Sequence, residues 1–275
     1  MTDVIDLPLS TQSQGAEHRP RIIAVANQKG GVGKTTTTIN LATALAAVNQ
    51  RVLIVDLDPQ GNASTGLGLR PSDREISSYD VLINGNSLEE ARKDTSIPRL
   101  TIVPSGMDLS GAEIELVDFE RREMQLKESL AKLPQDVDYV LIDCPPSLGL
   151  LTLNALVASD AVLVPLQCEF FALEGISHLV RTIKRVKKAF NPDLEIQGIV
   201  LTMYDKRNNL SAQVANDVRD YFGDVVYRTV IPRNVRVSEA PSHGTPVLVY
   251  DIKCPGSRAY LNLASEVLKR EGVKA

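Results

Sequence analysis

The chain has 275 residues, of which 43% are hydrophobic and 23% charged, enough apolar material for one large domain with a full core. Its formal net charge of −4, taken alone, argues weakly against nucleic-acid binding. No run of about 18 apolar residues occurs, so we expect no membrane-spanning helix.

The cysteines and the first residues bear on the compartment. Cys144, Cys168 and Cys254 lie far apart and form no C-x-x-C pair. This pattern favours reduced structural thiols in the cytoplasm over a disulfide framework, a zinc site or iron–sulfur ligands. Residues 1–20 are polar and lack the basic and apolar regions of a signal peptide, so we expect a disordered tail.

After this tail, short apolar runs alternate with amphipathic segments. The runs at 51–56 and 139–143 are apolar almost throughout, as expected of strands covered on both faces in a parallel sheet. The predicted strands span 21–27, 51–56, 100–104, 139–143, 161–165, 195–203, 225–231 and 246–250. The predicted helices span 34–48, short pieces within 77–95, 108–132, 148–157, 170–190, 208–222 and 256–271.

This alternation predicts an α/β fold, with a doubly wound, mostly parallel sheet and helices on both faces. We therefore expect residues 21–275 to form a single domain. Ligands of such sheets bind at the carboxyl ends of the strands. The polar motifs of this chain follow predicted strands, so they should meet at that edge.

A glycine-rich stretch separates the first predicted strand from the first predicted helix. It reads Asn27-Gln-Lys-Gly-Gly-Val-Gly-Lys34-Thr35-Thr36. Glycines let backbone N–H groups surround phosphate oxygens, and the positive end of the helix adds to the attraction. Lys34 is placed to reach the β- and γ-phosphates, and the Thr35 hydroxyl to bind Mg²⁺. The predicted contacts of ATP or ADP in this loop are Lys29, Gly30, Gly31, Val32, Gly33, Lys34, Thr35 and Thr36.

The stretch departs from the usual phosphate-loop pattern G-x-x-x-x-G-K-[ST], because Gln28 stands at the first glycine position. A second lysine, Lys29, follows it. Positioned cations stabilise the charge of a transferring phosphoryl group, so both Lys29 and Lys34 are predicted to be catalytic.

Aspartates end two of the predicted strands. Asp143 ends the strand 139–143, where a carboxylate that holds Mg²⁺ belongs, although a strand-end Asp can also cap the next turn. Asp56 and Asp58 end the strand 51–56, and hydrolysis needs a group that orients the attacking water. A structural role for Asp56 stays equally open.

Basic residues are concentrated in one part of the chain. Between Arg181 and Arg236, eleven Lys and Arg oppose six Asp and Glu, a balance of +5 that leaves −9 for the rest. Such a surface can bind DNA phosphates without reading sequence, although a solvated helix face is the alternative. Four of these residues share one face of the predicted helix 170–190: Arg181, Lys184, Arg185 and Lys188.

The glycine-rich loop resembles the deviant phosphate-binding loop of the ParA/MinD group of P-loop ATPases. Later segments are similar to those of the chromosomal ParA (Soj-like) partitioning ATPases, and the resemblance covers about residues 21–270. The segments are Asp56-Leu-Asp-Pro-Gln-Gly-Asn62, Asp143-Cys-Pro-Pro-Ser147 and Ile231-Pro-Arg-Asn-Val-Arg-Val-Ser-Glu-Ala-Pro-Ser-His-Gly244.

This resemblance implies roles for single residues at the phosphates. Lys29 matches the signature lysine that crosses a dimer interface to the partner's nucleotide. Asp58 matches the carboxylate that orients the attacking water, with Asp56 nearer the metal. The implied metal set is Thr35, Asp56 and Asp143.

It also implies a base pocket and a DNA surface. The adenine pocket is expected among Met203 and Tyr204, and at Pro232, Arg233 and Asn234. The DNA contacts are expected at Arg207 and Arg236, together with the stripe residues Lys184, Arg185 and Lys188.

The function implied is an ATPase switch in the cytoplasm. ATP would join two subunits, the homodimer would bind nucleoid double-stranded DNA nonspecifically, and a ParB-like centromere-binding partner would stimulate slow hydrolysis. The result would be segregation of a chromosome or plasmid.

Two alternatives share the loop, a mover of protein cargo and a MinD-like membrane positioner. The segment 260–275 lacks the bulky apolar face of a membrane anchor, so we expect no membrane partner. An iron–sulfur reductase of the same fold is disfavoured by the absent cysteine pair.

Overall fold

A computed structural model describes residues 19–169 and 172–273. Its centre is one sheet with the strand order β3-β4-β2-β5-β1-β6-β7-β8. Every neighbouring pair is parallel except β3 and β4. The strands are β1 (Arg21–Val25), β2 (Val52–Asp56), β3 (Lys93–Asp94), β4 (Leu100–Val103), β5 (Tyr139–Asp143), β6 (Ala161–Gln167), β7 (Glu195–Tyr204) and β8 (Val226–Pro232).

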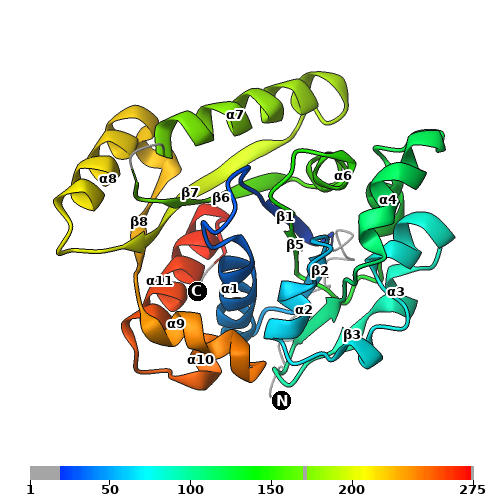
Figure 1. The fold of residues 1–275 in the computed structure, drawn as a ribbon, viewed down its shortest axis with the longest axis horizontal. Coiled ribbons are helices and arrows are strands. Elements are labelled where there is room, and N and C mark those ends of the chain that lie inside the picture. The colour runs from blue at the N-terminus through cyan, green and yellow to red at the C-terminus, as the bar shows by residue number, and fades with distance from the viewer. Residues whose placement is uncertain (1–18, 170–171, 274–275) are drawn as a thin grey trace, which may run out of the picture.

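Helices cover both faces of this sheet (Figure 1). The α-helices are α1 (Lys34–Ala47), α2 (Asn62–Gly66), α3 (Leu88–Ala91), α4 (Leu109–Glu115), α5 (Gln125–Leu130), α6 (Leu150–Ala158), α7 (Ala172–Ala189), α8 (Asn209–Phe222), α9 (Val235–Glu239), α10 (Val247–Tyr250) and α11 (Pro255–Arg270). A π-helical turn spans Asp80–Asn84, and short 3₁₀ turns span Pro71–Asp73, Leu116–Asp118, Gly223–Val225 and Ala240–His243.

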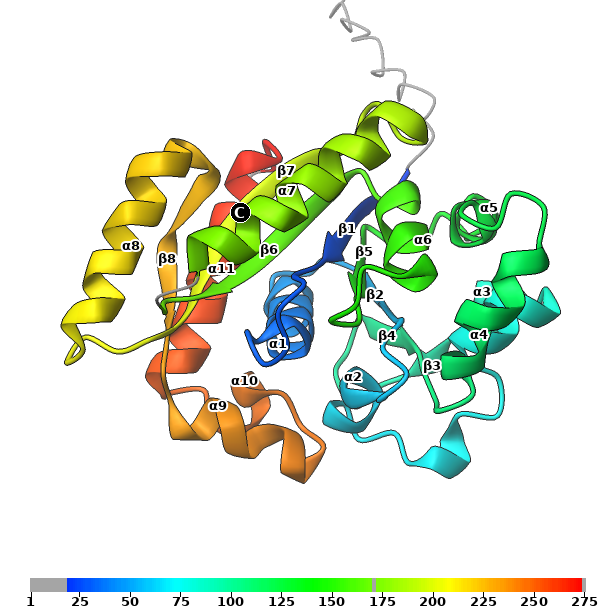
Figure 2. The ribbon, with the colours of Figure 1, turned by 45° about the horizontal axis from the view of Figure 1, so that its top comes forward.

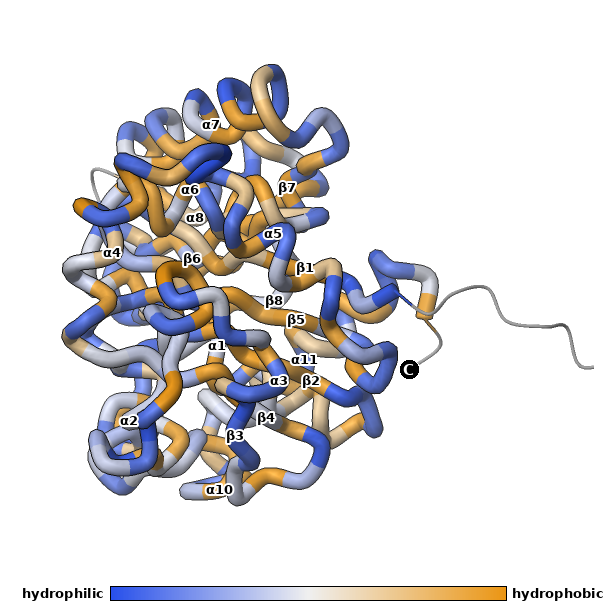
Figure 3. Tube along the Cα trace, turned by 90° about the vertical axis from the view of Figure 1, so that its right-hand side faces the viewer, coloured by the Kyte–Doolittle hydropathy of each residue, from blue (hydrophilic) through white to orange (hydrophobic). Residues whose placement is uncertain are grey.

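Two hydrophobic cores lie on opposite faces of the sheet. The first joins the sheet to α4, α5, α6, α7 and α8, and the second joins it to α1, α10 and α11. Figure 2 shows α1 and α7 on opposite sides of the strands. The strands between them are continuously apolar, which Figure 3 shows along β1, β5 and β6. The doubly wound, mostly parallel sheet predicted from the alternation is confirmed.

Two predicted elements are wrong. The run 246–250 was expected as a strand, but Pro246 instead starts the single helical turn α10. This turn buries Val247 and Leu248 and leaves Val249 exposed, and a continuous apolar run of this length does not separate strand from helix.

The expected helix 108–132 is broken into α4 and α5. Between them Arg121 adopts the left-handed φ of 53°, which a continuous helix does not allow. Asn154 of α6 replaces the lost helical bonds, because its amide donates to the Arg122 carbonyl (2.8 Å) and accepts from Leu126 N–H (3.2 Å).

Some elements lie outside the predictions. The antiparallel β3 was not expected, nor were the short helices α2 and α9. The expected tail falls almost wholly outside the described residues, and only Arg19 and Pro20 of it are described. No helix in the described parts of the chain is both long and apolar enough to cross a bilayer.

Candidate nucleotide-binding site

The glycine-rich loop runs from the end of β1 to the start of α1. Gly31 and Gly33 have φ of 74° and 89°, a left-handed backbone that favours glycine. Gly33 is also the N-cap of α1, and it has no side chain that could cap the helix by a hydrogen bond. The N–H groups of the first helical turn are therefore free to bind an anion, with the helix dipole behind them.

The two lysines of the loop have different surroundings. Lys34 is buried, and its Nζ donates to the Lys29 carbonyl (3.2 Å). Burial lowers the pKa of Lys34, an effect that nearby Asp143 opposes. Lys29 is about half exposed, and its ammonium forms an ion pair with Glu169, just after β6. Glu169 was not among the predicted site residues.

Asp143 and Asp56 lie side by side at the ends of β5 and β2, where they are paired in register. Both carboxylates are fully buried. Desolvation, followed by the charge of Asp56, raises the pKa of Asp143 to about 8, against hydrogen bonds from Thr35 and Thr38. Desolvation likewise raises the pKa of Asp56 to about 6.

The oxygens of Asp143 fit a divalent cation. Oδ1 accepts from the Thr38 hydroxyl (3.1 Å), whereas the buried Oδ2 has no hydrogen-bond partner in the described structure. A buried carboxylate oxygen without a partner is costly unless a proton or a cation joins it. Mg²⁺ takes hard oxygen ligands, often one carboxylate with phosphates and waters, and Thr35 lies close to the Asp143 carboxylate.

Asp56 has other partners. Its Oδ2 accepts from the N–H (2.9 Å) and the hydroxyl (2.7 Å) of Ser64, and its Oδ1 accepts from the Asp58 N–H (3.2 Å). Asp56 therefore holds the turn that carries Asp58, a use that the sequence left open. Asp58 is nearly buried, and its Oδ1 accepts from the Gln60 N–H (3.0 Å).

The predicted base residues other than Tyr204 line one pocket. Met203, Pro232, Arg233 and Asn234 line a cavity of about 310 Å³, a volume within the range of small-ligand sites. Gly33 and Thr36 of the phosphate loop line the same cavity, so base and phosphate positions are contiguous. Other lining residues were missed by the sequence analysis: Thr202, Ile231, Val237, Ser238, Pro241 and Tyr260.

Local backbone geometry shapes this pocket. Met203 has a left-handed φ of 51°, uncommon for a non-glycine residue. The Arg233 N–H donates to the Tyr204 carbonyl (3.0 Å), which fastens the loop after β8 to the end of β7. Asn234 caps α9, because its Oδ1 accepts from the Arg236 (2.9 Å) and Val237 (3.4 Å) N–H groups. The amide Nδ2 of Asn234 is thus the group left for a base edge.

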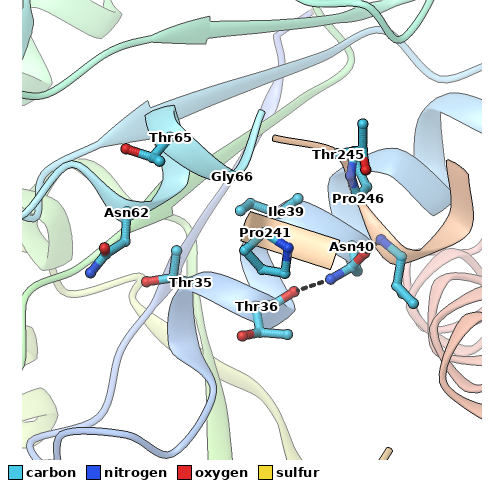
Figure 4. A pocket seen from close by; sticks show the side chains of 11 residues that line it. Thr35, Thr36, Ile39, Asn40, Asn62, Thr65, Gly66, Pro241, Thr245 and Pro246 are labelled. Carbon is cyan, nitrogen blue, oxygen red and sulfur yellow. Dashed lines mark hydrogen bonds between the residues drawn. The ribbon is translucent and has the colours of Figure 1, made fainter. Parts of the chain in front are cut away.

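A second pocket shares Thr36 and Pro241 with the first (Figure 4). The start of α1, the helix α2 and the segment 241–247 surround a cavity of about 270 Å³. The Asn40 amide donates to the Thr36 carbonyl (2.8 Å) and accepts the Val247 N–H (2.8 Å), which ties α10 to α1. The start of α1 thus lines both pockets.

The predicted DNA residues do not form one continuous surface. Arg207, whose side chain is 89% exposed, follows β7 and pairs with Asp205 (2.9 Å). Arg236, on α9, pairs with Glu239 (3.1 Å). The exposed stripe residues Lys184, Arg185 and Lys188 lie near the far end of α7, which packs on the opposite face of the sheet from α9.

Comparison with known proteins identifies the family. The family described as "AAA domain" matches residues 20–196. The chromosome partitioning protein ParA of Caulobacter vibrioides is 61% identical over 253 residues, which cover 91% of this chain and 95% of that protein. The chain belongs to the ParA/Soj family of P-loop ATPases.

Other relatives agree. The sporulation initiation inhibitor protein Soj of Bacillus subtilis is 54% identical, over 90% of this chain and 98% of its own. A crystal structure of cobyrinic acid a,c-diamide synthase from Mycobacterium smegmatis, with bound ADP and magnesium, superposes with a TM-score of 0.81. That structure is 41% identical and covers 92% of this chain and 96% of its own. The ParA/Soj membership predicted from the motifs is confirmed.

Proposed function

We propose that this member of the ParA/Soj family is a DNA-binding switch that ATP turns on and hydrolysis turns off. ATP joins two copies of the chain, the dimer binds double-stranded DNA nonspecifically on the nucleoid, and a ParB-like centromere-binding protein stimulates hydrolysis. Relatives named for chromosome partitioning, at 61% and 52% identity, support segregation as the purpose.

The observation that carries this proposal is that Asp143 and Asp58 lie close enough to Lys34 of the phosphate loop for their charges to act on it. Lys34 and the backbone N–H groups of the loop bind the β- and γ-phosphates. Thr35 and Asp143 hold Mg²⁺, which neutralises phosphate charge when bound. Asp56 acts as a structural residue and not as a direct metal ligand, because both its carboxylate oxygens already accept hydrogen bonds from Asp58 and Ser64.

Asp58 orients the attacking water. The hydrogen bond from the Asp58 N–H to the Asp56 carboxylate sets the position of its backbone. The hydrogen bond from the Gln60 N–H to Asp58 Oδ1 orients its side chain. The water oxygen attacks the γ-phosphorus as the bond to the β-phosphate oxygen breaks, giving ADP and phosphate. Asp58→Ala should bind ATP and accumulate as a dimer while hydrolysing it slowly.

The base binds between the loops after β7 and β8. Apolar contacts come from Met203 and Pro232, and the free amide of Asn234 donates to a base edge. Arg233 contributes through its backbone, which closes the pocket against Tyr204.

Lys29 acts across the dimer, and Arg207 and Arg236 act on DNA. Arg207 follows β7 and Arg236 lies on α9, the segments next to Met203 and Asn234 of the base pocket, so pairing of two subunits would bring together two sets of phosphate contacts. The stripe of Lys184, Arg185 and Lys188 forms a separate basic surface on α7, able to contact the flanking duplex.

The test measures binding to double-stranded DNA with ADP, with ATP and with a nonhydrolysable analogue, across a salt series. We expect binding only with ATP or the analogue, with a steep fall as salt rises. Arg207→Ala should abolish it, and Asp217→Ala, on the exposed face of α8, is the control. Binding that ignores the nucleotide, or an absence of binding, would contradict the switch and favour a protein cargo or a membrane.

A further inference from the structure

A closed ring of hydrogen bonds holds the backbone of Asp58. The Ser105 N–H donates to Ser64 Oγ (3.0 Å), and the Ser64 hydroxyl donates to Asp56 Oδ2 (2.7 Å). The other Asp56 oxygen accepts the Asp58 N–H (3.2 Å), and the Asp58 carbonyl accepts the Ser105 hydroxyl (2.7 Å). The ring joins the end of β2, the helix α2 and the loop after β4.

Burial makes this ring stiff. Asp56, Ser64 and Ser105 are fully buried and Asp58 is 7% exposed. Hydrogen bonds strengthen one another in such surroundings, and a buried group that loses its partner is costly. The Asp58 N–H is therefore held by Asp56, and its carbonyl accepts two hydrogen bonds, from the Gly61 N–H of its own turn (2.8 Å) and from the Ser105 hydroxyl. Ser105 is the partner that reaches Asp58 from a distant segment, the loop after β4.

Arg74 fastens Ser105 in turn. Its Nη1 donates to the Ser105 carbonyl (3.0 Å), and its Nη2 donates to Thr65 Oγ1 (2.8 Å) and the Leu69 carbonyl (2.7 Å). The guanidinium lies directly over Gly61, where an added Cβ would come 2.4 Å from Nη1. Among the described residues Arg74 forms no ion pair, so its hydrogen bonds serve this turn.

We propose that Ser105 is a positioning residue for ATP hydrolysis, and that it acts by holding the Asp58 backbone while Arg74 holds the Ser105 loop. This inference rests on the proposed role of Asp58. It adds a requirement that lies outside the phosphate loop and the two aspartate motifs. Ser105 touches neither the phosphates nor the water in this account, so it should affect turnover and not nucleotide affinity.

The experiment compares Ser105→Ala with wild type, with Ser105→Thr and with Ser110→Ala, a control on the exposed side of α4. We measure kcat and KM for ATP, the ATP-dependent dimer by light scattering, and Tm. Misplacement of a reacting group by about 1 Å can cost about a hundredfold, so we expect kcat of Ser105→Ala to fall by about ten- to a hundredfold. KM and dimer formation should stay within about twofold, and Ser105→Thr should retain most of the turnover because it keeps the hydroxyl.

A second background separates this inference from the proposed function. If Ser105 acts through Asp58, then Ser105→Ala should lower kcat no further in an Asp58→Ala chain. Wild-type kcat in Ser105→Ala, or a parallel loss of turnover, ATP binding and Tm, would overturn the positioning role. Wild-type turnover in Asp58→Ala alone would instead overturn the proposed function. Arg74→Lys, which cannot make the forked contact, should lower kcat in the same direction.

Discussion

Lys29 forms an ion pair with Glu169 of its own chain, across the gap between the phosphate loop and the end of β6. The lysine proposed to reach a partner's nucleotide therefore already has an anion beside it. If Lys29 reaches the partner's nucleotide as proposed, the partner's phosphates compete with the Glu169 carboxylate for one ammonium group, and dimer formation replaces an internal contact with an external one.

Glu169→Gln should make dimer formation easier. The Lys29 side chain is 45% exposed and that of Glu169 is 32%, and exposed pairs contribute about 0–1 kcal/mol. We therefore expect the ATP concentration for half-maximal dimer to fall by about two- to fivefold, measured by sedimentation. Glu174→Gln, an exposed charge change on α7, is the control. Equal or weaker dimer formation would show that Glu169 does not restrain Lys29.

Asp205→Asn should strengthen DNA binding. Arg207 donates to both Asp205 oxygens, from Nε (3.0 Å) and Nη2 (2.9 Å). These contacts lower the pKa of Asp205 to about 2, so the carboxylate stays charged at neutral pH and competes with DNA phosphates. Fluorescence anisotropy should show tighter binding than for Asp217→Asn, which makes the same charge change without an arginine partner. Equal gains would assign the effect to net charge alone.

Asp143 should make stability depend on pH in the absence of Mg²⁺. Its folded pKa is raised to about 8 from an ordinary 3.8, so between these values the folded state keeps a proton that the unfolded state has lost. The free energy of unfolding should therefore fall as pH rises from about 4 to about 8. Asp143→Asn, which mimics the neutral acid, should flatten this part of the profile in thermal melts. A slope unchanged in that variant would place its source elsewhere.

Gly198→Ala should destabilise the fold. An added Cβ would lie 2.4 Å from the Tyr227 ring, which is fully buried and covered by the Arg270 guanidinium at 4.0 Å. The Tyr227 ring has no free space to move into, so the free energy of unfolding measured in urea should fall by about 1–3 kcal/mol. Gly175→Ala on α7 meets nothing within 4 Å and should be neutral or stabilising. Equal stability of the two variants would contradict this packing argument.

The sequence predicted the sheet and the phosphate loop because their signals are local. The run 139–143 is apolar because a strand of a parallel sheet is buried on both faces. The glycines before Lys34 are required because the backbone has to turn around an anion there. The family was likewise readable, since each of its motifs is a short continuous segment. The residue roles assigned to Asp58, Arg207 and Asn234 remain predictions.

What escaped prediction depends on contacts between distant segments. Ser105 and Arg74 look like ordinary loop residues until β4 and α2 are brought against the end of β2. Glu169 carried a weak signal, because it follows a predicted strand at the edge where ligands bind. The run 246–250 was predicted as a strand because it is apolar without the alternation that separates strand from helix. Its helical turn depends on Pro246 at the N-cap and on the contact of Val247 with Asn40 of α1.

β1 lies at the centre of the strand order, with β5 and β2 on one side and β6, β7 and β8 on the other. Asp56, Asp58 and Asp143 lie on the first side, and the loops that line the base pocket lie on the second. The loop after β1 adjoins both sides, and α2 of the first side also packs on the segment Ala240–His243 of the second. In the proposed switch, the loss of the γ-phosphate therefore has two structural routes to the base pocket and to Arg236, one through the phosphate loop and one through α2.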